Sequence, residues 1–214
     1  MKLLYLFFFF FLLSVTITNA QSDKFQKSME NYVSKLDTAS SASTFKALAN
    51  GFERIATAEK TQWLPYYYSA YCYVLGAFMQ RDPQELDKIA DKSELLLNKA
   101  DSLSQKNSEI ACLMSMVNSA RIMVDPQNRG MKYGMLSSQY LMTAKNLDPS
   151  NPRPYLLEAQ SKIYTPEQWG GGKVAAKKSL DEGKSRLETF KPASKLHPTW
   201  GAKLVEMVEG QLKQ

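Results

Sequence analysis

The hydrophobic positions along this chain recur with the spacing of α-helices, and no segment alternates as a β-strand would. Apolar residues return at intervals of about three and four, which places them on one helical face. Prolines and short polar stretches separate these segments. The pattern predicts about nine helices, over Asp23–Leu36, 44–58, Trp63–Gln80, Pro83–Leu103, Ser108–Val124, Arg129–Leu147, Pro152–Tyr164 and Lys173–Phe190, and from Trp200 onward. An all-α fold is therefore expected.

Core positions repeat along the chain with a period of about 44 residues. The clearest copies are Ser93, Leu97 and Ala100 with Ser137, Leu141 and Ala144, and Tyr66, Ala70 and Tyr73 with Ile110, Met114 and Val117. A small residue between larger ones allows two helices to approach closely. The sequence thus predicts an α-solenoid of stacked antiparallel helix pairs.

The junction Ala144–Tyr155 favours one class of repeat. Pro149 cannot continue a helix, Asn151 is a good N-cap, and Pro152 suits a first turn. Such a junction is typical of tetratricopeptide (TPR) repeats, although these are usually about 34 residues long. HEAT-type repeats, at about 40–47 residues, fit the period better. We favour a TPR-like geometry with lengthened helices, and the alternative stays open.

The first 20 residues have the features of a secretory signal peptide. Lys2 precedes an apolar run from Leu3 to Val15, and small residues follow up to Ala20. The run is shorter than the roughly 20 residues that a membrane span needs. Cleavage after Ala20 would leave one domain, residues 21–214, in the periplasm or outside the cell, with no stable membrane insertion of the mature chain.

Four stretches of the second half of the chain resemble a family of small exported TPR-like proteins of bacteria. They are Val124–Gly130, Asn146–Arg153, Tyr164–Lys173, and Phe190–Pro192 with His197–Gly201. The resemblance implies an all-helical repeat fold. It implies no chemistry for particular residues.

The charge distribution argues against a nucleic-acid partner, and the positions of the two cysteines argue for a role in the core. The 27 basic and 21 acidic residues give a net charge of +6. Basic residues lie among acidic ones, so we expect no nucleic-acid partner. Cys72 and Cys112 lie in apolar segments and are expected as core residues, although a disulfide between them is an alternative.

No set of residues forms a catalytic or metal-binding motif. Gly170–Lys173 precedes a helix but lacks the first glycine and the Ser/Thr of a phosphate-binding loop. We expect this loop to let Trp169 fold back onto the helices. His197 is the single histidine, and no serine lies in a nucleophile elbow. We therefore predict no enzyme, no cofactor and no metal.

Tyrosines in the segment Trp63–Gln80 suggest a binding groove. Tyr67 and Tyr71 lie one step from the repeat seam, where TPR-like stacks line a groove, and tyrosine combines contact area with a polar tip. The candidate partner-binding residues are Tyr67, Tyr71, Asn118, Gln160 and Tyr164. The alternative is that these tyrosines fill the core.

The leading hypothesis is an exported, non-enzymatic helical-repeat scaffold that binds a protein or peptide partner. A second hypothesis is a small-ligand carrier or enzyme that uses the Trp169–Gly172 loop. A third is a structural subunit of an envelope assembly. The sequence does not name the partner.

Overall fold

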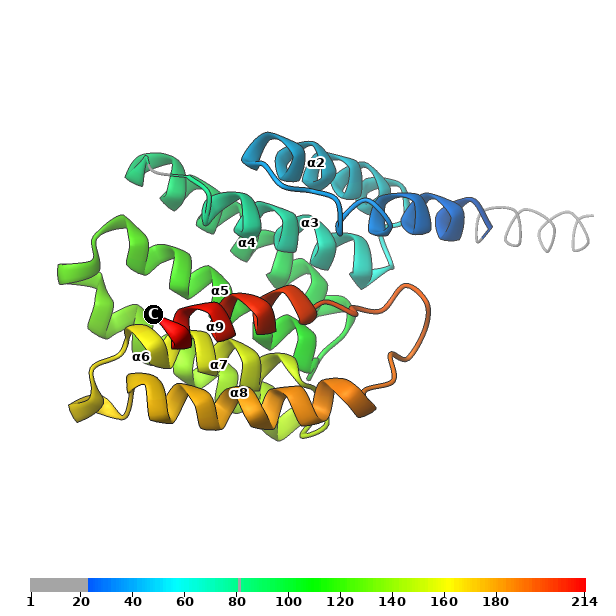
Figure 1. Cartoon of the computed structure of the whole chain (residues 1–214). Helices are drawn as coiled ribbons and strands as arrows, with labels where there is room; N and C mark the ends of the chain where they lie inside the picture. The colour runs from blue at the N-terminus through cyan, green and yellow to red at the C-terminus, as the bar shows by residue number, and fades with distance from the viewer. Residues whose placement is uncertain (1–22, 81) are drawn as a thin grey trace, which may run out of the picture.

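Helices follow one another along the described chain, mostly with short connections, and a long segment of residues 190–201 precedes the last helix (Figure 1). The computed structural model describes residues 23–80 and 82–214, of which residues 23–33 are helical. The elements that follow are α2 (Ala42–Ala58), α3 (Trp63–Ala77), α4 (Pro83–Leu103), α5 (Ser108–Val124), α6 (Pro126–Leu147), α7 (Arg153–Tyr164), the 3-10 helix η1 (Glu167–Trp169), α8 (Gly172–Thr189) and α9 (Ala202–Lys213). These residues contain no strand. The predicted all-α fold is confirmed.

Side-chain caps fix where several helices begin. Ser41 Oγ accepts a hydrogen bond from the Thr44 amide, and Asp82 Oδ1 accepts one from the Gln84 amide. Asp125 caps α6 in the same way, with Pro126 in the first turn. The predicted start of this helix at Arg129 is therefore wrong: the pair Asp125–Pro126 ends α5 and begins α6.

The small residues of the repeat lie where helices cross. Ala100 and Ala144 are fully buried, as the period predicts. At Gly183 in α8, an added Cβ would come within 2.5 Å of Leu156 Cδ2 in α7. Larger side chains at these positions would separate the helices, so the spacing in the sequence determines how closely neighbours pack.

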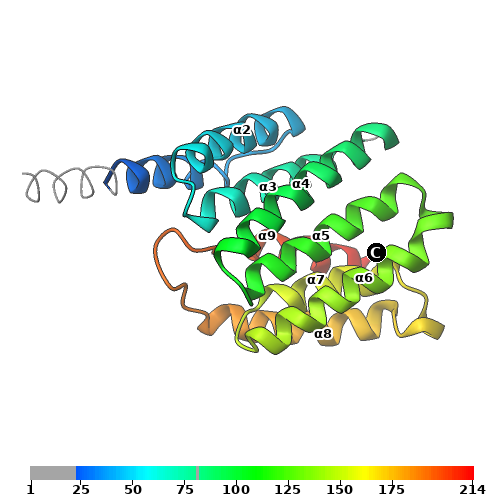
Figure 2. The same ribbon diagram turned by 180° about the vertical axis from the view of Figure 1, so that it is seen from behind.

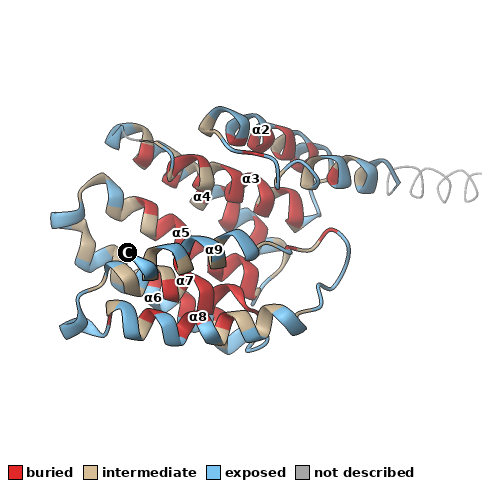
Figure 3. Cartoon of the chain, viewed as in Figure 1, coloured by how far each residue is buried: buried red, intermediate tan, exposed pale blue. Residues whose placement is uncertain are grey.

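Two apolar clusters form most of the core (Figure 3). The larger one extends over α2, α3, α4 and α5 and includes Phe52, Tyr68 and Leu113. The smaller one joins α7, α8 and α9 through Leu156, Leu180 and Val208. Helix α9 lies on the face turned to the viewer in Figure 1 and on the far face in Figure 2.

Some sequence-based expectations concern residues outside this description. The predicted signal peptide, residues 1–20, lies outside the described residues, and the domain limits 21–214 stay a prediction. Within the described ranges, no helix has the length and apolar character needed to cross a bilayer. Cys72 and Cys112 are both buried and free, so the alternative of a disulfide between them is not realised.

Candidate functional site

The segment between α8 and α9 covers the tyrosine-rich face of α3. Tyr68 OH donates to the Leu196 carbonyl at 2.8 Å, and Trp200 Nε1 donates to Tyr67 OH at 2.8 Å. The Trp200 ring stacks on Tyr71 with centroids 5.2 Å apart. The protein's own C-terminal segment therefore occupies the face on which a groove was predicted.

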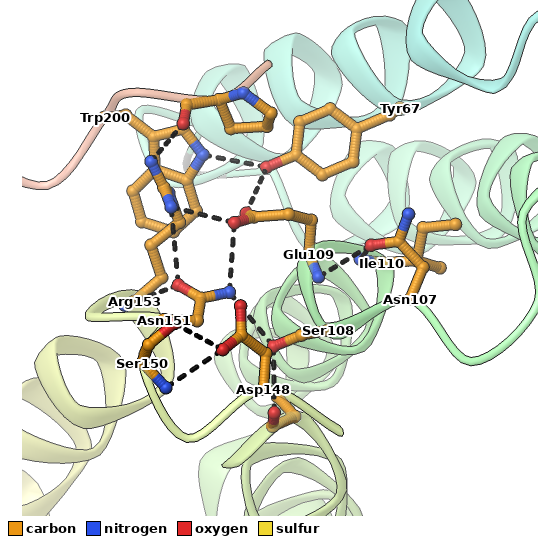
Figure 4. A network of polar contacts seen from close by, with 12 residues as sticks. Tyr67, Asn107, Ser108, Glu109, Ile110, Asp148, Ser150, Asn151, Arg153 and Trp200 are labelled. Carbon is orange, nitrogen blue, oxygen red and sulfur yellow. Dashed lines mark hydrogen bonds and ion pairs between the residues drawn. The ribbon is translucent and has the colours of Figure 1, made fainter. Parts of the chain in front are cut away.

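A group of buried polar side chains, the Arg153 network, lies beneath this segment (Figure 4). Its members are Tyr67, Ser108, Glu109, Asn151, Arg153 and Trp200. Arg153 Nη1 donates to Glu109 Oε1 at 2.8 Å, and its Nη2 donates to the Pro198 carbonyl. Tyr67 OH donates to Glu109 Oε2 at 3.2 Å. These bonds join α3, α5, α7 and the C-terminal segment.

The proline junction positions Arg153 in this network. Asn151 Oδ1 accepts a hydrogen bond from the Arg153 amide at 3.0 Å, which directs the first turn of α7 inward. Asn151 Nδ2 donates to Glu109 Oε1 and to Ser108 Oγ, each at 3.0 Å. Ser108 in turn donates to the Ala144 carbonyl at 2.8 Å. The end of α6 and the start of α7 are thus fixed to the start of α5.

Burial controls the protonation of this network. It raises the pKa of Glu109 to about 7, because the loss of water outweighs the attraction of Arg153 and the hydrogen bond from Tyr67. Burial also holds the pKa of Tyr67 well above its ordinary value, so this phenol is neutral. The Arg153 guanidinium carbon lies 4.8 Å from the centroid of the Phe190 ring and 5.2 Å from that of the Trp200 ring, and both rings attract its charge.

The central side chains of the Arg153 network present no surface to a substrate. Arg153 and Tyr67 are both fully buried. The sequence analysis did not single out Arg153 or Glu109. A signal was available, because the two opposite charges are 44 residues apart, which matches the repeat period. Residues one repeat apart occupy corresponding places on adjacent helix pairs and can therefore meet.

The structure does not bring the five predicted partner-binding residues together on one surface. Tyr67 and Tyr71 are buried beneath Trp200. Asn118 is buried and donates to the Met114 carbonyl at 2.8 Å. Gln160 is half-buried in α7, and Tyr164 at the end of α7 is 70% exposed. A role in binding for these residues stays a prediction, and only Tyr164 presents most of its ring to solvent.

A shallow hollow of about 470 Å³, here called the α8 hollow, lies beside the first turns of α8. It is lined by Lys173, Val174, Lys177, Lys178, Asp181 and Leu212. Val174 is 86% exposed, although large apolar side chains are usually covered. The Tyr164 hydroxyl accepts a hydrogen bond from Gln211, the neighbour of Leu212, so an exposed aromatic ring lies close to this hollow.

Three glycines form the tight connection between α7 and α8. Gly170 and Gly172 have φ angles of 81° and 87°, which disfavour residues with a side chain. An added Cβ on Gly171 would lie 1.9 Å from the Thr165 carbonyl oxygen. The loop is tight, as expected, but Trp169 does not fold back onto the helices. Its side chain is 70% exposed, so that prediction is wrong.

The α8 hollow carries an excess of positive charge. Lys177 pairs with Asp181 at 2.8 Å. Lys173 and Lys178 are exposed and make no hydrogen bond or ion pair within residues 23–80 and 82–214. The same part of the chain contains no group of three or more side chains suited to a metal ion. The hollow therefore offers uncovered apolar atoms beside two free cations, a combination that suits an apolar anion.

Comparison with known proteins decides the family. The chain is similar to the HusA haemophore from Porphyromonas gingivalis, with 38% sequence identity and a TM-score of 0.80. The match covers 88% of this chain and 92% of HusA. The chain belongs to the HusA family. No protein-family model matches this HusA-like sequence, and no curated protein matches it.

Membership of the HusA family corrects the function and the partner that the sequence predicted. The interpretation as a scaffold for a protein or peptide partner is wrong, because HusA is a haemophore. The physical reason for the error is that Tyr67 and Tyr71 contact Trp200 of the same chain. No family model supports the TPR assignment, which stays a prediction, whereas the all-helical fold agrees with HusA.

Proposed function

We propose that this chain is an exported, non-enzymatic protein that binds and carries haem. One observation carries the proposal, the 38% identity with the HusA haemophore over 88% of the chain. At this identity the chains share a fold over nearly their whole lengths, and a shared ligand is the simplest expectation.

The surface around the α8 hollow is consistent with such a ligand. Haem is a flat apolar ring with two carboxylates, so its site needs exposed apolar or aromatic groups and a few cations. Trp169, Tyr164 and Val174 supply exposed apolar and aromatic surface at this end of the molecule. Glu109 and Tyr67 of the Arg153 network have raised pKa values but are buried, so they are not placed to act on a substrate, which supports a carrier over an enzyme.

Titration of haemin into the purified chain tests this function. Haem absorbs strongly near 400 nm, and its spectrum changes when it leaves water for a protein site. We expect a saturable change with an affinity tighter than about 10 μM, equivalent to about 7 kcal/mol of binding free energy. A helical protein of similar charge and no relation to haem is the control. Absence of saturation, or the same change with the control protein, would contradict the proposal.

A further inference from the structure

Two lysines of the α8 hollow are unpaired beside uncovered apolar atoms. Val174 has the highest exposed fraction among the exposed large apolar residues of the described chain. Lys173 and Lys178, on either side of it in the sequence, have no partner in this part of the chain. Both lysines line the same hollow, so a ligand that placed a negative group near each of them would be attracted to this surface.

We propose that the α8 hollow binds the two carboxylates of haem, through Lys173 and Lys178, and holds the adjoining ring edge against Val174 and Leu212. This assignment rests on the proposed function and names the site for it. The ligand class is a planar apolar ring with two carboxylates on one edge.

Helix geometry places the groups as the proposal requires. Residues three and four apart on a helix are neighbours, so Lys173 adjoins Lys177, and Val174 adjoins Lys178. Lys173 and Lys178 are separated by about 7.5 Å along the helix axis and by about 140° around it, and both line the hollow. Asp181 already neutralises Lys177, with Nζ 2.8 and 2.9 Å from its two carboxylate oxygens. Two cations therefore remain for two carboxylates.

Helix α9 completes the apolar side of the hollow. Leu212 is half-buried and faces the first turns of α8 across the hollow. The hydrocarbon stems of the lysines can cover apolar ligand atoms while their ammonium groups stay in water. Gln211 bonds to the Tyr164 hydroxyl, and this places an aromatic ring at the rim. The ring edge of a bound haem would meet apolar atoms from two helices.

A second exposed apolar surface fits this ligand less well. Met131, Met135 and Met142 are exposed and lie on one face of α6. Ser138 lies between them on the same face, and the lysine that continues this face, Lys145, is already paired with Glu158 at 2.9 Å. The methionine stripe offers contact for the ring but no partner for its carboxylates, so we favour the α8 hollow.

The test compares two double variants of equal charge. Lys173→Glu with Lys178→Glu reverses the charges of the hollow. Lys46→Glu with Lys99→Glu makes the same change in net charge on exposed positions of α2 and α4. Both lysines are exposed, and Lys173 lies in the first turn of α8, where an acidic residue is favoured, so the hollow variant should remain folded, which circular dichroism checks.

We expect the dissociation constant for haemin to rise about tenfold or more in the hollow variant and less than twofold in the control variant. Haem dimethyl ester, whose carboxylates are blocked, should bind to the wild type and both variants with equal affinity. If haemin binds to the wild type and both variants respond alike, the assignment to this hollow is overturned while the proposed function stands. If haemin does not bind to the wild type, the proposed function and the assignment to this hollow are both wrong.

Discussion

The two ends of α7 use charge in opposite ways. At the first residue, Arg153 is fully buried and bonds to Glu109 and to the Pro198 carbonyl. At the last residue, Tyr164 is largely exposed, and the α8 hollow nearby carries two lysines without partners. The first end pairs a buried charge with groups inside the protein, and the last end leaves charge available to a ligand.

This difference separates stability from binding. A buried ion is costly unless partners surround it, so a change at the Arg153 end affects the whole fold. Exposed charges contribute little to stability, so a change at the Lys173 end should leave the fold intact. If the two ends of α7 differ in this way, variants at the Arg153 end lower stability, and variants at the Lys173 end lower affinity for haem.

The largest expected effect on stability comes from Arg153→Met. The substitution leaves the Glu109 carboxyl buried without its cation and frees the Pro198 carbonyl. We expect the free energy of unfolding to fall by about 3–5 kcal/mol, measured by urea unfolding followed by circular dichroism.

Two further variants test whether the loss of stability in Arg153→Met comes from the buried charge pair. Arg54→Met removes an exposed arginine that donates to Tyr32 OH, and should change stability by less than about 0.5 kcal/mol. Adding Glu109→Gln to Arg153→Met should recover part of the loss, because no carboxyl then remains without its cation. Equal losses for Arg153→Met and Arg54→Met would show that the network does not hold the fold.

The next effect is a dependence of stability on pH. Burial raises the pKa of Glu109 from its ordinary 4.5 to about 7. Between these values the folded chain keeps a proton that the unfolded chain has released. The folded state thus binds more protons, and the free energy of unfolding falls as pH rises from about 4.5 to about 7.

This pH effect has an upper bound of about 3.5 kcal/mol, because the pKa differs by about 2.5 units and one unit corresponds to about 1.4 kcal/mol. Measuring the free energy of unfolding of the wild type and of Glu109→Gln across this pH range isolates the contribution of Glu109. We expect the wild type to lose stability relative to the variant as pH rises. Parallel profiles would mean that Glu109 does not titrate as its burial implies.

The smallest effect on stability is expected for Trp169→Ala, at the opposite end of α7. Its side chain is 70% exposed, so the free energy of unfolding should change by less than about 0.5 kcal/mol. Affinity for haemin should fall about twofold to tenfold, because a stacked aromatic contact contributes roughly 0.5–1.5 kcal/mol. A large loss of stability, or unchanged affinity, would remove Trp169 from the binding region.

Much of the fold could be predicted from the sequence because local rules determine it. Spacing of apolar residues gave the helices, and the pair Asp82–Pro83 correctly marked the start of α4. The pair Asp125–Pro126 obeys the same rule and begins α6, whereas the predicted start was Arg129. The buried Ala100 and Ala144 show that small residues at a fixed period identify helix crossings.

The site could not be predicted in the same way, because it depends on distant pairings. Trp200 bonds to Tyr67 over 133 residues of sequence, and no local pattern indicates that contact. Tyr67 therefore resembled a surface residue. Arg153 was overlooked for the opposite reason, since arginine is rarely fully buried and its partner lies in another repeat.

The most direct test of the account is to map the ligand onto the chain by NMR, with a diamagnetic gallium protoporphyrin in place of haem. We predict that the amide shifts concentrate around Tyr164, Val174 and Leu212, and that those of Arg153 and Glu109 stay unchanged. Shifts concentrated on the face covered by Trp200, or along the methionine stripe of α6, would contradict the account.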